Sequence, residues 1–204
     1  MIILGIDGSP RKEANTYAFL QAALTRAAEL GAETRYIGLG DKTLSGCRGC
    51  YECVEVKRCV IGDDFQAIFA AMREADGILL ATPVYHASMT TEVKALMDRT
   101  GFSGRWAVSE MKAQDESYQW DACALTGKVV APITVARRTG QTMAFAELLM
   151  WGTCNDATVP GNAYWNIGMA GKGGARDAEQ DVEGMDNIRR LAERMVDTVE
   201  KLNR

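Results

Sequence analysis

Long apolar runs and common nucleotide-binding fingerprints are missing from this chain, and its 23 basic residues are outnumbered by 27 acidic ones. Apolar runs such as Ile78–Ala81 and Val129–Val135 are far shorter than the roughly 20 residues that a membrane-spanning helix needs. The net charge of -4 argues against a surface that binds nucleic acid or another polyanion. Neither a Walker loop nor a GxGxxG pattern occurs, which excludes the two commonest Gly-rich phosphate motifs.

Histidine and proline are scarce as well, and the sequence shows no secretion signal. The 204 residues include 1 histidine and 4 prolines, and no basic leader precedes the opening MIILGIDGSP. We therefore expect a cytoplasmic protein, in which clustered cysteines indicate metal or redox chemistry before disulfides. The balance of 47% hydrophobic and 25% charged residues is typical of a folded chain, and the length predicts a single domain over residues 1–204.

Short apolar segments alternate with segments of helical period, and this alternation predicts an α/β fold. The expected strands are Met1–Ile6, Thr34–Leu39, Gly77–Ala81, Lys128–Val135 and Ala157–Pro160. The expected helices are Asn15–Leu30, Asp64–Ala75, a segment through Lys94 and Met97, Thr142–Trp151 and a long C-terminal helix. The pattern predicts a flavodoxin-like, doubly wound, five-stranded parallel sheet with helices on both faces, which binds ligands beyond the carboxyl ends of its strands.

Three stretches break this alternation. A four-cysteine loop is predicted at residues 44–62 and a Gly-rich loop at residues 161–176. Residues 102–126 carry Trp106, Tyr118 and Trp120 among polar residues. We interpret this third stretch as an insertion rather than a core element.

The loop after the first predicted strand has the composition of a phosphate site. It reads GSPRKEANT and leads into a helix, so backbone N–H groups and the positive end of the helix dipole meet there. Ser9, Asn15 and Thr16 supply short polar side chains. Arg11 supplies a charge that pairs with an anion. The alternative is an ordinary turn in which Asn15 or Thr16 caps the helix.

The loop ATPVYHAS, after the third predicted strand, lies where doubly wound sheets bind flat ligands. Tyr85 offers a ring for stacking, and Ser88 offers a hydroxyl for a polar ring edge. His86 has no partner positioned by the sequence, so we interpret it as a loop residue. We assign no catalytic acid or base in the chain.

A third loop, VARRTGQ, follows the fourth predicted strand. The adjacent Arg137 and Arg138 predict a second anionic contact, to a flavin edge or a dinucleotide phosphate. A solvated turn before a helix is the alternative, and the sequence favours neither.

Four of the six cysteines lie close together with the spacing Cx2Cx2Cx5C, at Cys47, Cys50, Cys53 and Cys59. This spacing resembles the ladders that hold a [4Fe–4S] cluster. Four reduced thiols without metal are the second interpretation. Zinc is the third, because structural zinc sites usually split their ligands into two separated pairs. The remaining Cys123 and Cys154 are interpreted as buried thiols.

Taken together, these segments resemble the NADPH-dependent FMN reductase family of flavodoxin-like proteins, and within it the iron–sulfur flavoproteins. The segments shared with the family are IDGSPRKEANT, ADGILLATPVY with the downstream VKALMDRTG, and VARRTGQ. They lie in order between residue 1 and about residue 160. The mark of the subgroup is GCRGCYECVEVKRCVIGDDF.

The resemblance implies the cofactor FMN and a set of contacts to it. The residues implied to hold its phosphate are Ser9, Arg11, Asn15 and Thr16. Those implied to border its ring are Pro83, Val84, Tyr85, His86 and Ser88, with Ala136, Arg137, Arg138 and Gly140 on the other side. VARRTGQ has fewer glycines than the family usually has here, so we expect Arg137 or Arg138 to replace backbone contacts.

The expected function is that of an FMN-dependent oxidoreductase with a [4Fe–4S] cluster passing electrons to or from FMN. The expected donor is NAD(P)H, and the expected acceptor is a quinone, a free flavin or a similar small molecule. A cluster-free flavin or quinone reductase is one alternative. Others are an electron carrier fed by a ferredoxin-like protein, and a zinc-stabilised module that binds a phosphate ligand. The resemblance also implies a homodimer or homotetramer.

Overall fold

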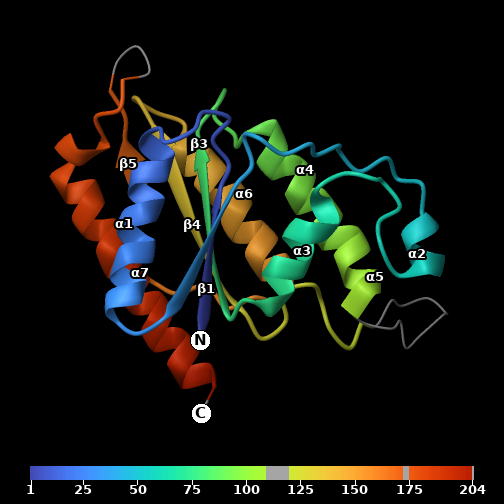
Figure 1. The fold of residues 1–204 in the computed structure, drawn as a ribbon. Helices are drawn as coiled ribbons and strands as arrows, with labels where there is room; N and C mark the ends of the chain where they lie inside the picture. The colour runs from blue at the N-terminus through green and yellow to red at the C-terminus, as the bar shows by residue number, and fades with distance from the viewer. Residues whose placement is uncertain (109–119, 172–174, 204) are drawn as a thin grey trace.

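Five parallel strands form one sheet in the order β2-β1-β3-β4-β5 (Figure 1). The strands are β1 (Ile2–Asp7), β2 (Glu33–Gly38), β3 (Gly77–Pro83), β4 (Val129–Ala136) and β5 (Ile167–Met169). This is the strand order of flavodoxin-like doubly wound folds, so the predicted fold class is confirmed. The computed structural model describes residues 1–108, 120–171 and 175–203.

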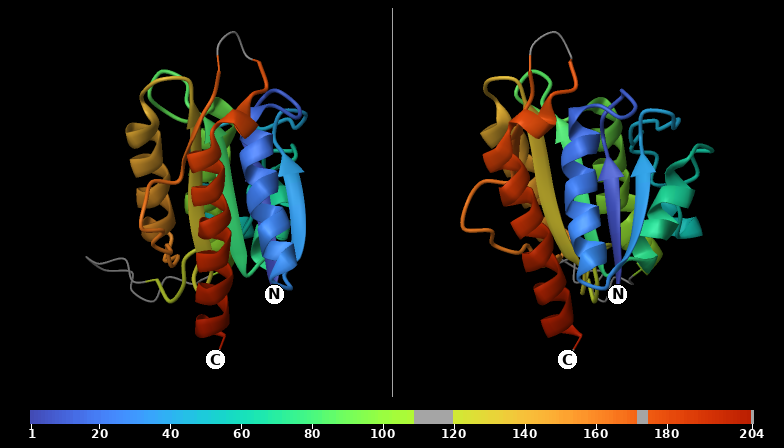
Figure 2. Two further views of the ribbon diagram at one scale, coloured as in Figure 1. Left: turned by 90° about the vertical axis from the view of Figure 1, so that its left-hand side faces the viewer. Right: turned by 60° about the vertical axis from the view of Figure 1, so that its left-hand side comes forward.

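Helices cover both faces of the sheet (Figure 2). One face carries α1 (Asn15–Glu29) and α7 (Val182–Leu202), which pack against each other. The other face carries α3 (Phe65–Glu74), α4 (Thr91–Arg99) and α6 (Gln141–Cys154). Two apolar cores result, one on each face, and successive residues of the inner strands alternate between them. This is why β3 and β4 read in the sequence as continuous apolar runs.

The predicted helices are present, with ends shifted by a few residues at most. Gly31 has φ +91° and ends α1 in the left-handed region, as the sequence indicates. Short elements were not foreseen in the irregular stretches. They are α2 (Glu52–Val56), a π-helical turn (Thr100–Gly104), α5 (Arg105–Val108) and a 3₁₀ turn (Ala178–Gln180).

The prediction of the fifth strand at Ala157–Pro160 is wrong. Thr158 makes a single bridge to Val129 beside the start of β4, and the chain then leaves the sheet at Pro160, which has no N–H to donate. The chain returns to β4 as β5, paired with Thr134–Ala136, inside the stretch predicted to be a loop. Its Gly168 approaches Phe19 of α1 so closely that a Cβ there would clash with the ring. A short edge strand built around such a glycine carries no apolar run to predict it.

The interpretation of residues 102–126 as an insertion outside the core is wrong at both ends of the stretch. Ser103 and Gly104 are buried where the π-helical turn prolongs α4. Ala124 and Leu125 are buried in the core beneath α3 and α6. The middle of the stretch, residues 109–119 with Tyr118, lies outside the described residues.

Candidate functional site

Loops from three neighbouring strands meet at the carboxyl edge of the sheet and enclose one pocket. We call it the three-loop pocket. Most of the predicted ligand residues line it: Ser9, Arg11, Asn15, Thr16, Pro83, Val84, Tyr85, Ala136 and Arg137. The sequence did not single out its other lining residues, which are Ala14, Val135, Ala170 and Gly171. The parallel sheet therefore brings together segments that lie more than a hundred residues apart.

The loop between β1 and α1 is held rigidly by its own hydrogen bonds. The Ser9 hydroxyl donates to the Arg11 carbonyl (3.0 Å) and accepts from the Arg11 N–H (3.1 Å). Gly8 donates its N–H to the Ala81 carbonyl (2.7 Å) and accepts from the Thr90 hydroxyl (2.8 Å). A Cβ at Gly8 would collide with Val93 of α4. The loop thus has one conformation set by close packing against α4.

Besides lining the pocket, Asn15 forms hydrogen bonds with a segment about 160 positions away in the sequence. Its amide group donates to the Ala175 carbonyl (2.9 Å) and to the Asp177 carboxylate (3.2 Å). Its oxygen accepts from the N–H groups of Asp177 (2.9 Å) and Ala178 (2.8 Å). Asp177 in turn accepts from the N–H of Gly171 (2.7 Å). Asn15 therefore fastens the segment after β5 to the first loop, at the wall of the pocket.

Two of the predicted residues after β3 turn away from the three-loop pocket. His86 and Ala87 both take left-handed conformations in a tight turn that the Tyr85–Ser88 bridge closes. The Ser88 hydroxyl donates to the Glu147 carboxylate of α6 (2.8 Å). His86 is exposed, in agreement with its interpretation as a loop residue. Only Pro83, Val84 and Tyr85 of this loop line the pocket.

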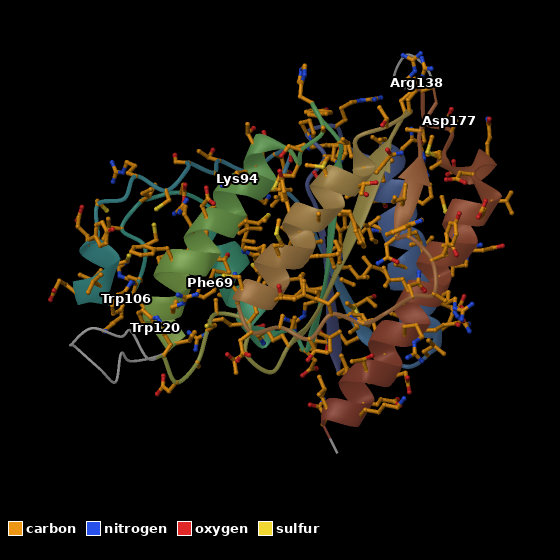
Figure 3. All side chains as sticks on the ribbon, turned by 180° about the vertical axis from the view of Figure 1, so that it is seen from behind. Phe69, Lys94, Trp106, Trp120, Arg138 and Asp177 are labelled. Atoms are coloured by element: carbon orange, nitrogen blue, oxygen red, sulfur yellow. The ribbon has the colours of Figure 1, made fainter. Side chains whose placement is uncertain are left out.

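The loop after β4 divides in the same way. Arg137 lines the pocket, whereas Arg138 is exposed at the outer rim of this end of the molecule (Figure 3). Gly140 has φ +92° at the start of α6, where a Cβ would press on Val84 and Ala87. Its role in the structure is to let two loops pack together. Arg138 and Gly140 are not among the residues that line the pocket.

A buried carboxyl group lies beneath the first loop. Asp7, the last residue of β1, is 1% exposed and accepts from the Ser9 N–H (2.8 Å) and the Tyr36 hydroxyl (3.2 Å). Burial raises the pKa of Asp7 to about 6, although both hydrogen bonds act in the opposite direction. At neutral pH the Asp7 carboxyl is ionised in the interior, and its desolvation lowers the free energy of unfolding.

We expect the free energy of unfolding to fall as pH rises from about 4 through about 6, because of Asp7. The folded protein keeps this proton to higher pH than the unfolded chain does, so ionisation favours unfolding in that window. A shift of this size corresponds to roughly 3 kcal/mol. Urea unfolding across the window, compared between the wild type and Asp7→Asn, measures it, and the variant should lose the slope. Asp41→Asn is the control. Hydrogen bonding to Lys42 lowers the pKa of Asp41, so that group titrates below the window.

All four clustered cysteines line a second, smaller pocket, which we call the cysteine pocket. Its walls also include Tyr51, Val60, Ile61, Arg99 and Phe102. Cys53 is buried on α2, Cys59 is half-buried, and Cys47 and Cys50 are exposed. Burial raises the pKa of the Cys53 thiol, and the charges of the other three thiols add to the effect, since all lie near it. In the described part of the chain, no three His, Cys, Asp or Glu side chains converge closely enough to hold a single metal ion.

The backbone of the cysteine loop is bent into strained conformations. Gly49, Tyr51 and Lys57 have φ of +61°, +62° and +57°, and the two non-glycine residues bracket α2. Left-handed conformations at such residues cost of order 1 kcal/mol each and persist only where the surroundings impose them. Here the surroundings are aromatic. Tyr51 packs edge-on against Phe102 (5.3 Å between centroids), and Lys57 lies over Trp106 (5.2 Å).

The stretch that the sequence left without a role therefore supports the cysteine loop. Trp106 of α5 also packs against Trp120 (4.5 Å between centroids), and both are seen beside α5 in Figure 3. Arg105 lies over the Trp120 ring (5.3 Å). Its aromatic residues give this stretch a packing function next to the cysteine pocket.

The neck of the cysteine loop is closed by two carboxylates. Asp64 accepts from the Thr43 N–H (2.7 Å), and Asp63 accepts from the Ser45 N–H (2.9 Å). Asp63 also pairs with Arg99 of α4 (2.6 Å), with both side chains at most 2% exposed. The two ends of the loop are thereby fixed to each other and to α4.

The family described as NADPH-dependent FMN reductase matches residues 1–172. The chain belongs to this family. It is accordingly an FMN-dependent oxidoreductase, as the sequence predicts. None of the described helices is both long and apolar enough to cross a membrane.

Two relatives of this chain are named iron–sulfur flavoproteins. The one from Methanosarcina thermophila is 31% identical over 206 residues, which is 100% of this chain and 98% of the relative. The one from Methanocaldococcus jannaschii is 47% identical over 100 residues, so that match spans 49% of this chain and 52% of that relative. Among solved structures, RosB with bound 8-demethyl-8-formylriboflavin-5'-phosphate has a TM-score of 0.77 at 18% identity, covering 100% of this chain and 80% of RosB. This last likeness shows the fold alone.

Sequence reasoning missed or misplaced three sets of side chains in this member of the FMN reductase family. The side chains of Asp63 and Asp64, just before α3, close the cysteine loop; Asp63 also accepts from the Phe65 N–H at the start of α3 (3.2 Å), whereas Asp64 makes no side-chain cap. Cys123 and Cys154 are half-buried and exposed, respectively, so the prediction of buried thiols is wrong. Arg99 lay inside the segment VKALMDRTG. The available signal for a buried Arg99 was its position on the core-facing side of the predicted helix.

Proposed function

We propose that this protein is an iron–sulfur flavoprotein. In this proposal FMN binds in the three-loop pocket, the four clustered cysteines hold a [4Fe–4S] cluster, and electrons pass between NAD(P)H and a small acceptor such as a quinone or a free flavin. The observation that carries the proposal is that the four cysteine side chains line one pocket, together with a buried arginine.

The first loop has the donors that a flavin phosphate requires. Thr16 lies in the first turn of α1, where backbone N–H groups and the helix dipole favour an anion, and Ser9 lies in the loop that leads to it. Arg11 contributes a positive charge on the same wall. Asn15 orders the loop by holding the segment after β5. We therefore assign the phosphate contacts to Ser9, Arg11 and Thr16, and a positioning role to Asn15.

The other two loops suit the flavin ring. Pro83, Val84 and Tyr85 form one side of the pocket, and Ala136 and Arg137 form another. Tyr85 is 47% exposed, so its ring is available to a flat ligand. The turn at His86–Ser88 and the contact of Gly140 with Val84 hold these walls in place. Arg138 is exposed and does not line the pocket, so we assign it no ring contact.

When bound, FMN supplies hydride and one-electron chemistry at its ring, and an iron–sulfur cluster supplies one-electron transfer. The protein's own residues bind and orient these groups. The described residues contain no dinucleotide-binding motif apart from the FMN site. In this proposal the nicotinamide ring therefore enters the three-loop pocket beside Tyr85.

The cysteine pocket fits a cluster better than a single ion. Its four thiols line one small space, and a four-iron cluster takes four cysteine thiolates as ligands. Val60, Ile61 and Phe102 give the pocket an apolar side, whereas Cys47 and Cys50 are exposed. Arg99 is a buried cation beside thiols that become anionic when they bind iron.

The test is an anaerobic absorption spectrum of freshly purified protein, with iron and acid-labile sulfide assayed on the same sample. Flavin bands over a broad iron–sulfur background, with about four irons per chain, would support the proposal. Flavin bands without iron would indicate a cluster-free reductase. Rapid anaerobic mixing with NADPH then tests the donor, because a flavin that does not bleach excludes NADPH and leaves a ferredoxin-like protein to be tried.

We expect Arg11→Ala to weaken FMN binding roughly 10- to 100-fold, the range of a lost charge-assisted hydrogen bond. Riboflavin, which lacks the phosphate, should bind the variant and the wild type equally. Fluorescence titration of both ligands measures the effect. Lys12→Ala is the matched control, because Lys12 is exposed in the same loop and does not line the three-loop pocket. Equal losses for FMN and riboflavin would contradict a phosphate contact.

A further inference from the structure

Arg99 is a fully buried cation at the wall of the cysteine pocket. It is 1% exposed, at the end of α4. Its Nη1 donates to the Asp63 carboxylate (2.6 Å) and to the Ser45 carbonyl (3.1 Å), and its guanidinium lies over the Phe65 ring (4.2 Å). These contacts fix the orientation of the guanidinium plane.

The other two guanidinium nitrogens are unsatisfied. In the part of the chain that the structure describes, the buried Nε and Nη2 of Arg99 have no hydrogen-bond partner. Buried donors of a charged group nearly always have partners, so each exception calls for an explanation. Arg99 lines the same pocket as all four cysteines.

We propose that Arg99 is a positioning residue of the iron–sulfur site, whose free Nε–H and Nη2–H groups donate to sulfur in the cysteine pocket and raise the reduction potential of the cluster. The inference rests on the proposed function, because it requires a cluster on the four cysteines. It goes further by assigning the control of the potential to a residue outside the cysteine motif.

The physical reason is charge. Reduction adds one electron and no proton, so the site becomes more negative by one charge, and no bond is broken. Hydrogen bonds to the sulfur atoms and a nearby positive charge stabilise the reduced state more than the oxidised one, which raises the potential. Lysine at this position keeps the charge but lacks the planar set of donors, so it cannot hold Asp63 and also donate from two fixed N–H groups.

The experiment is an anaerobic redox titration of the purified holoprotein, with the cluster followed by electron paramagnetic resonance and the flavin by absorbance. We expect Arg99→Lys to disfavour cluster reduction about tenfold, a decrease of about 59 mV for one electron. The flavin potential should not move, because the two pockets share no lining residue. Arg58→Lys is the control, since Arg58 is exposed in the cysteine loop and does not line the pocket.

An unchanged cluster potential in Arg99→Lys, with iron and flavin contents equal to those of the wild type, would overturn the inference. If Arg99→Lys does not fold, the cluster potential of Asp63→Asn tests the inference instead. Removing this carboxylate leaves the guanidinium charge less neutralised, so the cluster potential should rise, and a potential that does not rise would also overturn the inference. A wild type with flavin but no iron or sulfide would instead refute the proposed function itself.

Discussion

Replacing Cys50 with alanine is expected to remove nearly all iron and acid-labile sulfide from the protein while FMN stays bound. A cubane cluster needs four thiolate ligands, and the loop offers four that line one pocket. Cys50 is exposed, so its loss removes little packing and the fold should survive. Iron and sulfide assays with a flavin spectrum on the same sample measure the result. The absorbance should change from flavin plus a broad background to flavin alone.

Cys154→Ala is the matched control for this variant. Cys154 is also an exposed thiol, but it lies at the end of α6, outside the cysteine loop. It should keep the iron content and spectrum of the wild type. If Cys50→Ala kept its iron and sulfide, the proposed cluster ligands would be wrong. If both variants lost iron equally, the loss would reflect general damage to thiols rather than ligation.

Asp63→Ala is expected to lower the free energy of unfolding by about 3–5 kcal/mol, because it leaves the buried Arg99 charge without its partner. The variant also loses the acceptor for the Ser45 N–H at the neck of the cysteine loop. Chemical denaturation of the protein without its cofactors measures the effect on the fold alone. The cysteine loop should become sensitive to proteases before the sheet does, since its ends are no longer joined.

The neighbouring surface pair gives the control. Asp98 of α4 pairs with Lys94, and the side chains are 44% and 57% exposed, so Asp98→Ala should cost less than about 1 kcal/mol. Equal losses in the two variants would contradict the importance of burial. The Asp63 contribution should also disappear at low pH. Burial alone would raise the pKa of Asp63, but the hydrogen bonds from Arg99, Ser45 and Phe65 hold it below its ordinary value, so the stabilisation is lost as pH falls through that lowered pKa.

The sheet was largely predictable because its four long strands carry their own signal. Strands buried on both faces are mostly apolar, and β1, β3 and β4 are so apart from Asp7, Thr82 and Thr134. β5 escaped prediction because three residues around Gly168 carry no such pattern. Its position depends on where the chain re-enters beside β4 and on the space that Phe19 leaves.

The candidate site was predictable in its parts and not in its assembly. Position after a strand identified all three loops, because the carboxyl ends of parallel strands share one edge. Which residues of each loop line the pocket depends on turns closed by tertiary contacts. The Ser88 hydroxyl donates a hydrogen bond to the Glu147 carboxylate, and Gly140 lies against Val84. Neither contact has a signature in local sequence.

For this protein, the amino-acid sequence by itself determined the fold class, the three loops at the carboxyl edge of the sheet and the four-cysteine motif. These depend on periodicity and short-range spacing, which a linear chain displays directly. Only the tertiary structure decided that Arg99, 54 and 36 positions from Ser45 and Asp63, closes the cysteine loop and lines its pocket. A buried ion pair is made by segments that meet only when helix and loop pack on the sheet, so its energetic consequences arise with the fold.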